Sequence, residues 1–202
     1  MQPTQALIVL DMQNDFCHES GKLHGLVKDE LERTDAIAAT LRLVHAARDK
    51  GVLTIVSPIK FDYSGPSSAT PEGIVAPIVE QRAFDRNEFG GELIEDFARL
   101  ASEGSVLYME KPSLSAFAGT DLQSTLQDHG IEELVIAGLL TNLCVENTAR
   151  DAFDLGYRVR VVGDATATFD EDQQSFAVDT IFPMLGQVIS VDQFATPAAL
   201  RQ

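Results

Sequence analysis

The chain has 202 residues, 45% of them hydrophobic, and a formal net charge of −16. This length suits one domain with a full-sized core, so we expect residues 1–202 to form a single domain. The negative charge argues against nucleic acid and anionic membrane surfaces as partners, because their phosphates would be repelled.

Two cysteines, Cys17 and Cys144, are too few for a disulfide framework, and their spacing matches no zinc-binding pattern. The N-terminal run has no basic leader, and no segment is apolar over the length of a membrane span. These features predict a cytoplasmic protein.

The first part of the chain predicts a strand, a helix and a second strand. Residues 6–10 are a short apolar run of branched side chains, typical of a buried parallel strand, and Asp11 follows them. Apolar residues recur at helical spacing over residues 29–50, and Gly51 suits the position just past a helix. Residues 52–56 are the second predicted strand.

Residues 57–92, here called the excursion, form the irregular part of the chain, with four prolines and four glycines. A long loop inside a compact domain is usually functional. The excursion also holds apolar side chains, which favours an ordered segment. We interpret it as a partial cover over a site, with a purely structural loop as the alternative.

The rest of the chain alternates between predicted helices and predicted strands. Helices are predicted at residues 93–100, 121–129, 144–155 and 172–182, and strands at residues 106–109, 134–137, 158–162 and 188–191. A tail that is helical or loose is expected from Phe194. Strands that alternate with helices indicate an α/β fold with a parallel sheet covered on both faces.

Three reactive residues follow predicted strands, which places them at one edge of the sheet. Asp11 follows the first strand, Lys111 the third and Cys144 the fourth. Ligands of open α/β sheets bind beyond the carboxyl ends of the strands. Cys144 also falls at a predicted helix start, where unpaired N–H groups and the helix dipole favour a thiolate.

Each of these residues has a structural alternative when it is taken alone. An aspartate after a strand often caps a turn, a lysine is usually solvated, and a single cysteine is often a small core residue. Their shared edge favours a small-molecule hydrolase in which Cys144 is the nucleophile.

The segments around these residues, LIVLDMQNDF, MEKPSLSAF and AGLLTNLCV, resemble the signature segments of the isochorismatase-like cysteine hydrolases. The resemblance covers residues 6–191. It implies a three-layer α/β/α fold with a six-stranded, mainly parallel sheet, and commonly a homodimer or larger homo-oligomer. It also implies a catalytic triad of Cys144 as nucleophile, Asp11 as general acid–base and Lys111 as the orienting cation.

The resemblance further implies a thioester intermediate and an oxyanion hole. The hole is expected from the N–H groups of Leu140 and Cys144, with a non-proline cis peptide bond between Leu139 and Leu140. Phe16 and Phe117 are interpreted as walls of the substrate pocket, although aromatic residues at such positions are also typical of a core.

The sequence departs from two subgroups of the family that it resembles. Nicotinamidases bind a metal through histidines after the second strand, whereas the corresponding SPIKFDYSGPSS segment has no histidine. We therefore expect no metal and no cofactor. Isochorismatases cleave a vinyl ether without a cysteine nucleophile, so Cys144 favours an amide-type C–N bond.

Two alternatives stay open at this point. One alternative to the amide hydrolase is a catalytically silent small-molecule-binding protein of the same fold. The other is a hydrolase of a non-amide, ether-type bond. The identity of the substrate cannot be read from these residues.

Overall fold

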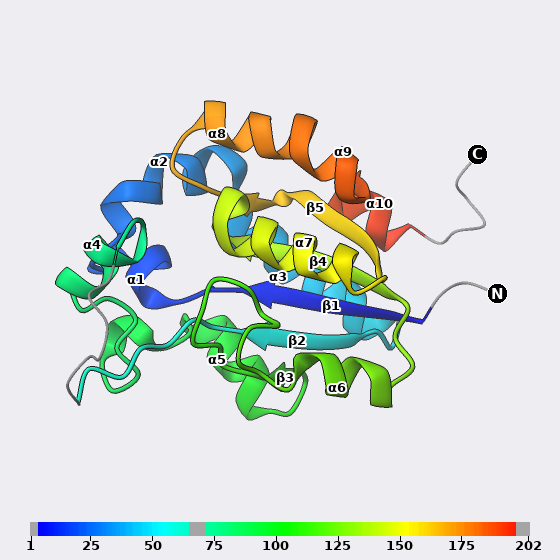
Figure 1. The fold of residues 1–202 in the computed structure, drawn as a ribbon, viewed down its shortest axis with the longest axis horizontal. Helices are drawn as coiled ribbons and strands as arrows, with labels where there is room; N and C mark the ends of the chain where they lie inside the picture. Colours follow the sequence, from blue (N-terminus) through cyan, green and yellow to red (C-terminus); the bar gives the residue numbers. More distant parts are fainter. Residues whose placement is uncertain (1–3, 65–71, 197–202) are drawn as a thin grey trace.

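A computed structural model describes residues 4–64 and 72–196. Its centre is a six-stranded sheet in the order β3-β2-β1-β4-β5-β6, with every strand parallel to its neighbours (Figure 1). The strands are β1 Gln5–Leu10, β2 Leu53–Ser57, β3 Leu107–Tyr108, β4 Glu133–Leu139, β5 Arg158–Ala167 and β6 Gln187–Ile189. The predicted α/β class with a parallel six-stranded sheet is confirmed.

Helices cover both faces of this sheet, and Figure 1 shows α7 in front of it and α3 behind it. The α-helices are α1 Asn14–Cys17, α2 His24–Thr34, α3 Ala36–Asp49, α4 Val75–Glu80, α5 Glu95–Ser102, α6 Leu122–Asp128, α7 Glu146–Asp154, α8 Glu171–Phe176, α9 Phe182–Leu185 and α10 Val191–Ala195. Short segments of other helical types are η1 Phe89–Gly91, η2 Thr141–Val145 and η3 Ala177–Ile181.

Strand β1 divides the hydrophobic core into two parts. Leu7 and Val9 pack into the part that contains α2, α3 and α5, whereas Ala6, Ile8 and Leu10 pack into the part that contains α6, α7 and α9. Side chains alternate across a strand, so a strand that is covered on both faces must be apolar at every position. This explains the continuous apolar run before Asp11.

The single helix predicted over residues 29–50 is wrong, because the structure has two helices there. Helix α2 begins earlier, at His24, and Asp35 separates it from α3 with a left-handed φ of 51°. Aspartate is one of the few non-glycine residues that adopt this conformation with little strain. The apolar periodicity continues across the break, so it gave no signal of it. Gly51 does follow the end of α3 with a positive φ of 66°, as predicted.

The helix predicted to begin at Cys144 begins earlier. A π-helical turn, η2, precedes α7, so Cys144 is the fourth residue of a continuous helical segment. A helix is also predicted over residues 172–182. In the structure these residues belong to α8, the π-helical η3 and the first residue of α9.

The excursion contains α4 and η1, and its residues 65–71 lie outside the described part of the chain. The predicted tail from Phe194 forms the end of α10 and otherwise lies outside that part as well. Within residues 4–64 and 72–196, no helix has the length and apolar character needed to span a membrane.

Candidate active site

The side chains of Asp11, Lys111 and Cys144 meet at the carboxyl edge of the sheet, and all three are buried. The Lys111 Nζ donates hydrogen bonds to Asp11 Oδ2 at 3.0 Å and to Cys144 Sγ at 3.5 Å. Its third bond, of 3.1 Å, goes to the carbonyl oxygen of Ser113. An ammonium group has three N–H donors, so each donor of Lys111 has an acceptor.

The backbone after β1 and β4 brings Asp11 and the nucleophile turn together. Leu10 pairs with Gly138 in the sheet, so the segments that follow β1 and β4 leave the sheet side by side. A Cβ on Gly138 would lie 2.2 Å from the Leu10 carbonyl oxygen, which no side chain allows. Asp11 then adopts a left-handed φ of 54°, and its Oδ1 accepts a 2.7 Å hydrogen bond from the Ile59 N–H.

Burial raises the pKa of the Cys144 thiol well above its ordinary value. The neighbouring Asp11 carboxylate raises this pKa further, and the Lys111 ammonium offsets only part of the rise. The expectation of a lowered thiol pKa is therefore wrong for the resting arrangement, because full desolvation outweighs the stabilisation of the anion. Cys144 rests as a thiol, and its proton must leave when it attacks.

The two charged partners have raised pKa values for different reasons. Burial raises the pKa of Asp11 and outweighs the opposing effects of Lys111, Cys144 and the Ile59 N–H. Burial alone lowers the pKa of Lys111, but Asp11 and Cys144 outweigh it, so the pKa of this ammonium lies above its ordinary value. The site therefore holds a permanent cation beside a carboxylate of increased basicity, which suits a proton acceptor.

The turn before Cys144 is held by two glutamines of α8. The peptide bond between Leu139 and Leu140 is cis, as predicted. The Thr141 hydroxyl donates a 2.6 Å hydrogen bond to Gln174 Oε1, and Asn142 Nδ2 donates a 2.7 Å bond to Gln173 Oε1. The helical segment that follows has Leu140 at its N-cap and no side-chain cap there.

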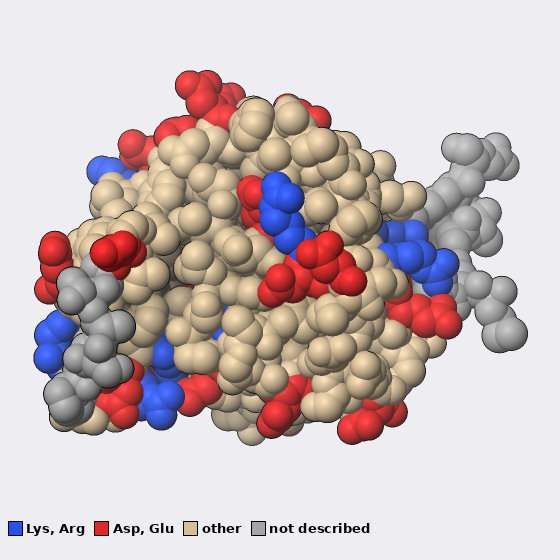
Figure 2. Space-filling view, viewed as in Figure 1, with Lys and Arg blue, Asp and Glu red and all other residues tan. Residues whose placement is uncertain are grey.

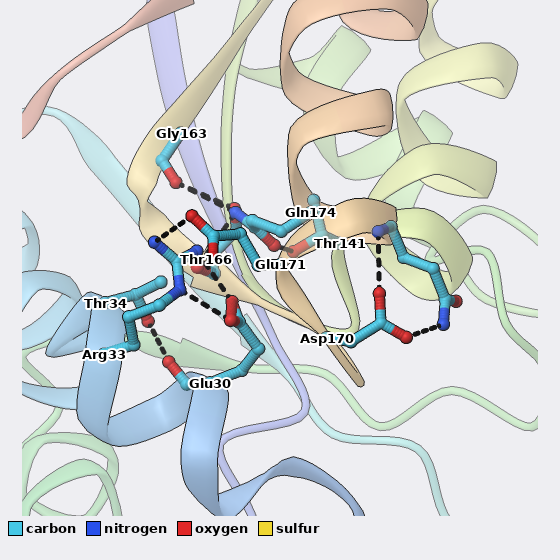
Figure 3. Close-up of polar contacts among 10 residues, drawn as sticks. Glu30, Arg33, Thr34, Thr141, Gly163, Thr166, Asp170, Glu171 and Gln174 are labelled. Atoms are coloured by element: carbon cyan, nitrogen blue, oxygen red, sulfur yellow. Dashed lines mark hydrogen bonds and ion pairs between the residues drawn. The ribbon is translucent and has the colours of Figure 1, made fainter.

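Gln174 links this turn to β5, as Figure 3 shows. Its Nε2 donates to Thr166 Oγ1 at 3.0 Å and to the Thr166 carbonyl oxygen at 3.3 Å. Thr141, Thr166 and Gln174 are all buried. A buried polar network whose members are satisfied fixes one geometry, so Gln174 holds the nucleophile turn in place.

A small apolar pocket borders the nucleophile turn. Phe16 lines it together with Leu140 and Leu143, which flank the nucleophile turn. Phe16 packs edge-on against Phe84 of the excursion, with ring centroids 4.8 Å apart. Phe117 is not among the pocket-lining residues and instead stacks on Tyr157 at 6.1 Å.

Polar residues after Asp11 tie the excursion to the site, a function that the sequence interpretation missed. Gln13 Nε2 donates a 2.8 Å hydrogen bond to the Gly91 carbonyl oxygen, and buried Asp15 accepts a 2.6 Å bond from the Phe84 N–H. The run of polar residues directly after a buried strand was the available signal. Its partners in the excursion lie 46 to 78 residues away, so the sequence does not show them.

The described residues do not fit a metal centre. Among residues 4–64 and 72–196, no group of three or more His, Cys, Asp or Glu side chains is arranged to hold a metal ion. We therefore assign no step at this site to a metal.

Comparison with known proteins finds related hydrolases. The family model described as "Isochorismatase domain" matches residues 5–193. A ureidoacrylate amidohydrolase, RutB, from Stutzerimonas stutzeri is 34% identical over 203 residues, covering 94% of this chain and 80% of the relative.

Two solved structures of related hydrolases have a similar fold. The nicotinamidase/pyrazinamidase PncA from Bacillus subtilis superposes with a TM-score of 0.75 and 28% identity, covering 93% of this chain and 100% of that chain. An N-carbamoylsarcosine amidase from Thermoplasma acidophilum gives a TM-score of 0.73 and 26% identity, covering 94% of this chain and 97% of that chain.

Proposed function

The chain belongs to the isochorismatase family, and from that premise we propose that it hydrolyses an amide-type C–N bond of a small molecule, with Cys144 as nucleophile. The names of the relatives above, an amidohydrolase, a nicotinamidase and an amidase, support a C–N bond as the target. The observation that carries the proposal is the buried contact of one Lys111 ammonium with both Asp11 and Cys144.

In the first half-reaction, Asp11 takes the proton from the Cys144 thiol as the sulfur attacks the carbonyl carbon. General-base help of this kind is worth roughly 10²–10⁴-fold. The tetrahedral intermediate then collapses: the C–N bond breaks, and Asp11 returns the proton to the leaving nitrogen. Ammonia or an amine leaves, and the acyl group stays on Cys144 as a thioester.

In the second half-reaction, water attacks the thioester carbonyl. Asp11 takes a proton from the water, the C–S bond breaks, and the proton returns to the Cys144 sulfur. Throughout, Lys111 keeps its charge beside Asp11 and stabilises negative charge on the sulfur. The N–H groups of Leu140 and Cys144 are the proposed donors to the oxyanion in both steps, and losing one such donor typically costs about 10²–10³-fold in rate.

The proposal is tested by following ammonia or amine release from a panel of primary amides, ureido acids and lactams. Cys144→Ala is expected to abolish release, and mass spectrometry of the wild-type protein is expected to detect an acyl group on Cys144. Turnover that is unchanged in Cys144→Ala would exclude the thioester route and favour an ether-type or other reaction. Absence of both turnover and acylation across the panel would favour a silent binding protein.

We also propose that the protein is a homo-oligomer and acts in the cytoplasm, where both cysteines remain reduced. Helices α7, α8 and α9 each have a large apolar side chain that is exposed: Phe153, Phe176 and Met184. Apolar side chains grouped on neighbouring elements are typical of an interface. Sedimentation analysis is expected to give a dimer or larger species, and Phe176→Ser with Met184→Ser is expected to weaken it. A monomer at all concentrations would contradict the assembly.

A further inference from the structure

The apolar pocket shares one wall with the nucleophile turn, through Leu140 and Leu143. Leu143 directly precedes Cys144, and Leu140 carries the N–H proposed to face the oxyanion. Phe16 lies in the same loop as Asp11. This shared wall is the geometric basis for assigning the pocket to the group next to the scissile carbonyl.

Elements outside the triad complete the pocket. The excursion contributes Ile74 and, from α4, Ile78, while α2 contributes Leu26. Leu26 and Ile74 are 54% and 38% exposed. Large apolar side chains around a concave surface gain stability when an apolar group covers them.

The pocket provides nothing that would bind a charged group. All nine described residues that line it have apolar side chains. Moving a carboxylate from water into such surroundings is unfavourable unless it gains a counter-charge or hydrogen bonds.

The Lys111 ammonium of the triad has no donor left for a substrate carboxylate. Each donor of Lys111 has an acceptor, on Asp11, Ser113 and Cys144. The formal net charge of −16 adds a repulsive field for anionic substrates. The apolar lining and the charge of the protein therefore both favour a neutral substrate.

We propose that the substrate is a neutral amide bearing a compact apolar group, a branched alkyl chain or a small aromatic ring, and that Phe16, Ile78 and Leu26 select this group. The proposal rests on the amide hydrolysis proposed above, and it adds the chemistry of the group next to the scissile bond. It assigns a substrate-selecting role to α4 and α2, which lie outside the catalytic triad.

Two isosteric amides test the selection. In 3-methylbutanamide an isopropyl group occupies the place of the carboxylate of malonamate, and both release ammonia on hydrolysis. We expect kcat/KM for 3-methylbutanamide to exceed that for malonamate at least tenfold, in keeping with the roughly 10–200-fold discrimination of hydrophobic pockets. Equal values, or a preference for malonamate, would overturn the proposal.

A variant at the exposed rim tests the assigned residues. Leu26→Arg places a cation at the pocket mouth on a half-exposed helix position, so the fold should tolerate it. It is expected to lower kcat/KM for 3-methylbutanamide about tenfold and to reverse or abolish the preference. The matched control, Leu155→Arg at the end of α7, starts from a similarly exposed leucine (43%) and should change neither value. Unchanged selectivity in Leu26→Arg would contradict the assignment of Leu26.

A binding measurement separates this inference from the proposed function. Cys144→Ala protein cannot turn the amides over through the thiol, so calorimetry reports binding alone. Tighter binding of 3-methylbutanamide than of malonamate supports the selection even if the wild-type protein releases no ammonia. Tighter binding of malonamate overturns the selection even if amide hydrolysis is confirmed.

Discussion

The buried Asp11–Lys111 pair is explained by chemistry better than by stability. Both side chains have no exposed surface, and taking two charges out of water costs about as much as their attraction returns. The pair keeps a carboxylate of raised pKa next to the Cys144 thiol, together with a cation that stabilises the sulfur anion once it forms.

Removing only one charge of this pair should be strongly destabilising. Lys111→Met leaves the Asp11 carboxylate buried without a counter-charge, which typically costs about 3–5 kcal/mol. Urea unfolding is expected to show a loss of this size. The double variant Asp11→Asn with Lys111→Met should recover a large part of it. A single variant as stable as the wild type would contradict a buried ion pair.

The Cys144 thiol makes stability fall at alkaline pH. Its pKa is raised in the folded state, so the folded protein keeps this proton while the unfolded chain loses it above about pH 8.5. Stability contributed by the thiol is complete below that pH and declines above it by up to about 1.4 kcal/mol per pH unit. Urea unfolding between about pH 7.5 and pH 10 should show a shallower decline for Cys144→Ala. Parallel curves for the two proteins would contradict the raised pKa.

At the scale of elements, two devices determine where Cys144 lies. The close approach of β1 and β4 at Gly138 places Asp11 beside the turn after β4, and α8 holds that turn through Gln174. Neither device touches a reacting atom, yet both determine whether the reacting atoms meet.

Thr141→Val should misplace the nucleophile while preserving the shape of the side chain. It removes the hydrogen bond to Gln174 Oε1 and leaves that buried oxygen without this donor. A displacement of about 1 Å costs as much as ~100-fold in rate, so we expect kcat to fall by roughly 10–100-fold with KM little changed. Thr141→Ser keeps the hydroxyl and should retain most activity. A wild-type kcat for the valine variant would show that the contact has no positioning role.

Gly138→Ala should disrupt the core of the sheet. The added Cβ would meet the Leu10 carbonyl oxygen at 2.2 Å, and the φ of 109° is unfavourable for alanine. We expect a loss of about 3 kcal/mol in the free energy of unfolding, since β1 and β4 must move apart. Gly25→Ala on α2 is the matched control, because nothing lies within 4 Å of its new Cβ. It should be neutral or stabilise by up to about 1 kcal/mol. Equal effects at the two glycines would contradict the close approach.

The whole molecule is strongly acidic, with 31 Asp and Glu residues against 15 Lys and Arg residues. Figure 2 shows that acidic side chains are spread over the face in view rather than gathered in one patch. Repulsion among them opposes the compact state and is screened by salt.

Raising the ionic strength should therefore stabilise the protein. The Debye length falls from about 30 Å at 0.01 M salt to about 8 Å at 0.15 M, so repulsion between distant carboxylates weakens. Thermal unfolding is expected to shift upward by a few degrees over this range. Sucrose at matched osmolality serves as the control for effects that do not involve charge. A downward shift in salt would mean that attractive surface ion pairs dominate.

The sequence by itself determined the alternation of strands and helices and the edge at which Asp11, Lys111 and Cys144 emerge. Both depend on local patterns: an apolar run makes a buried strand, and the residue after a strand lies at its carboxyl end. The resemblance added the cis bond between Leu139 and Leu140, which the structure contains.

Only the tertiary structure decided the break between two helices at Asp35 and the raised pKa of the Cys144 thiol. It also decided the hydrogen bond between Thr141 and Gln174 and the one by which Asp15 anchors the excursion. A pKa depends on desolvation and on charges brought together from distant parts of the chain. The position of Cys144 at a helix start therefore predicted a lowered thiol pKa, which is the wrong direction. The sequence also did not distinguish Phe16 from Phe117, since each is the aromatic residue that ends a signature segment. That the two rings form walls of the substrate pocket stays a prediction. Phe16 lines the apolar pocket and Phe117 stacks on Tyr157, because neighbours in space rather than in sequence decide where an aromatic ring packs.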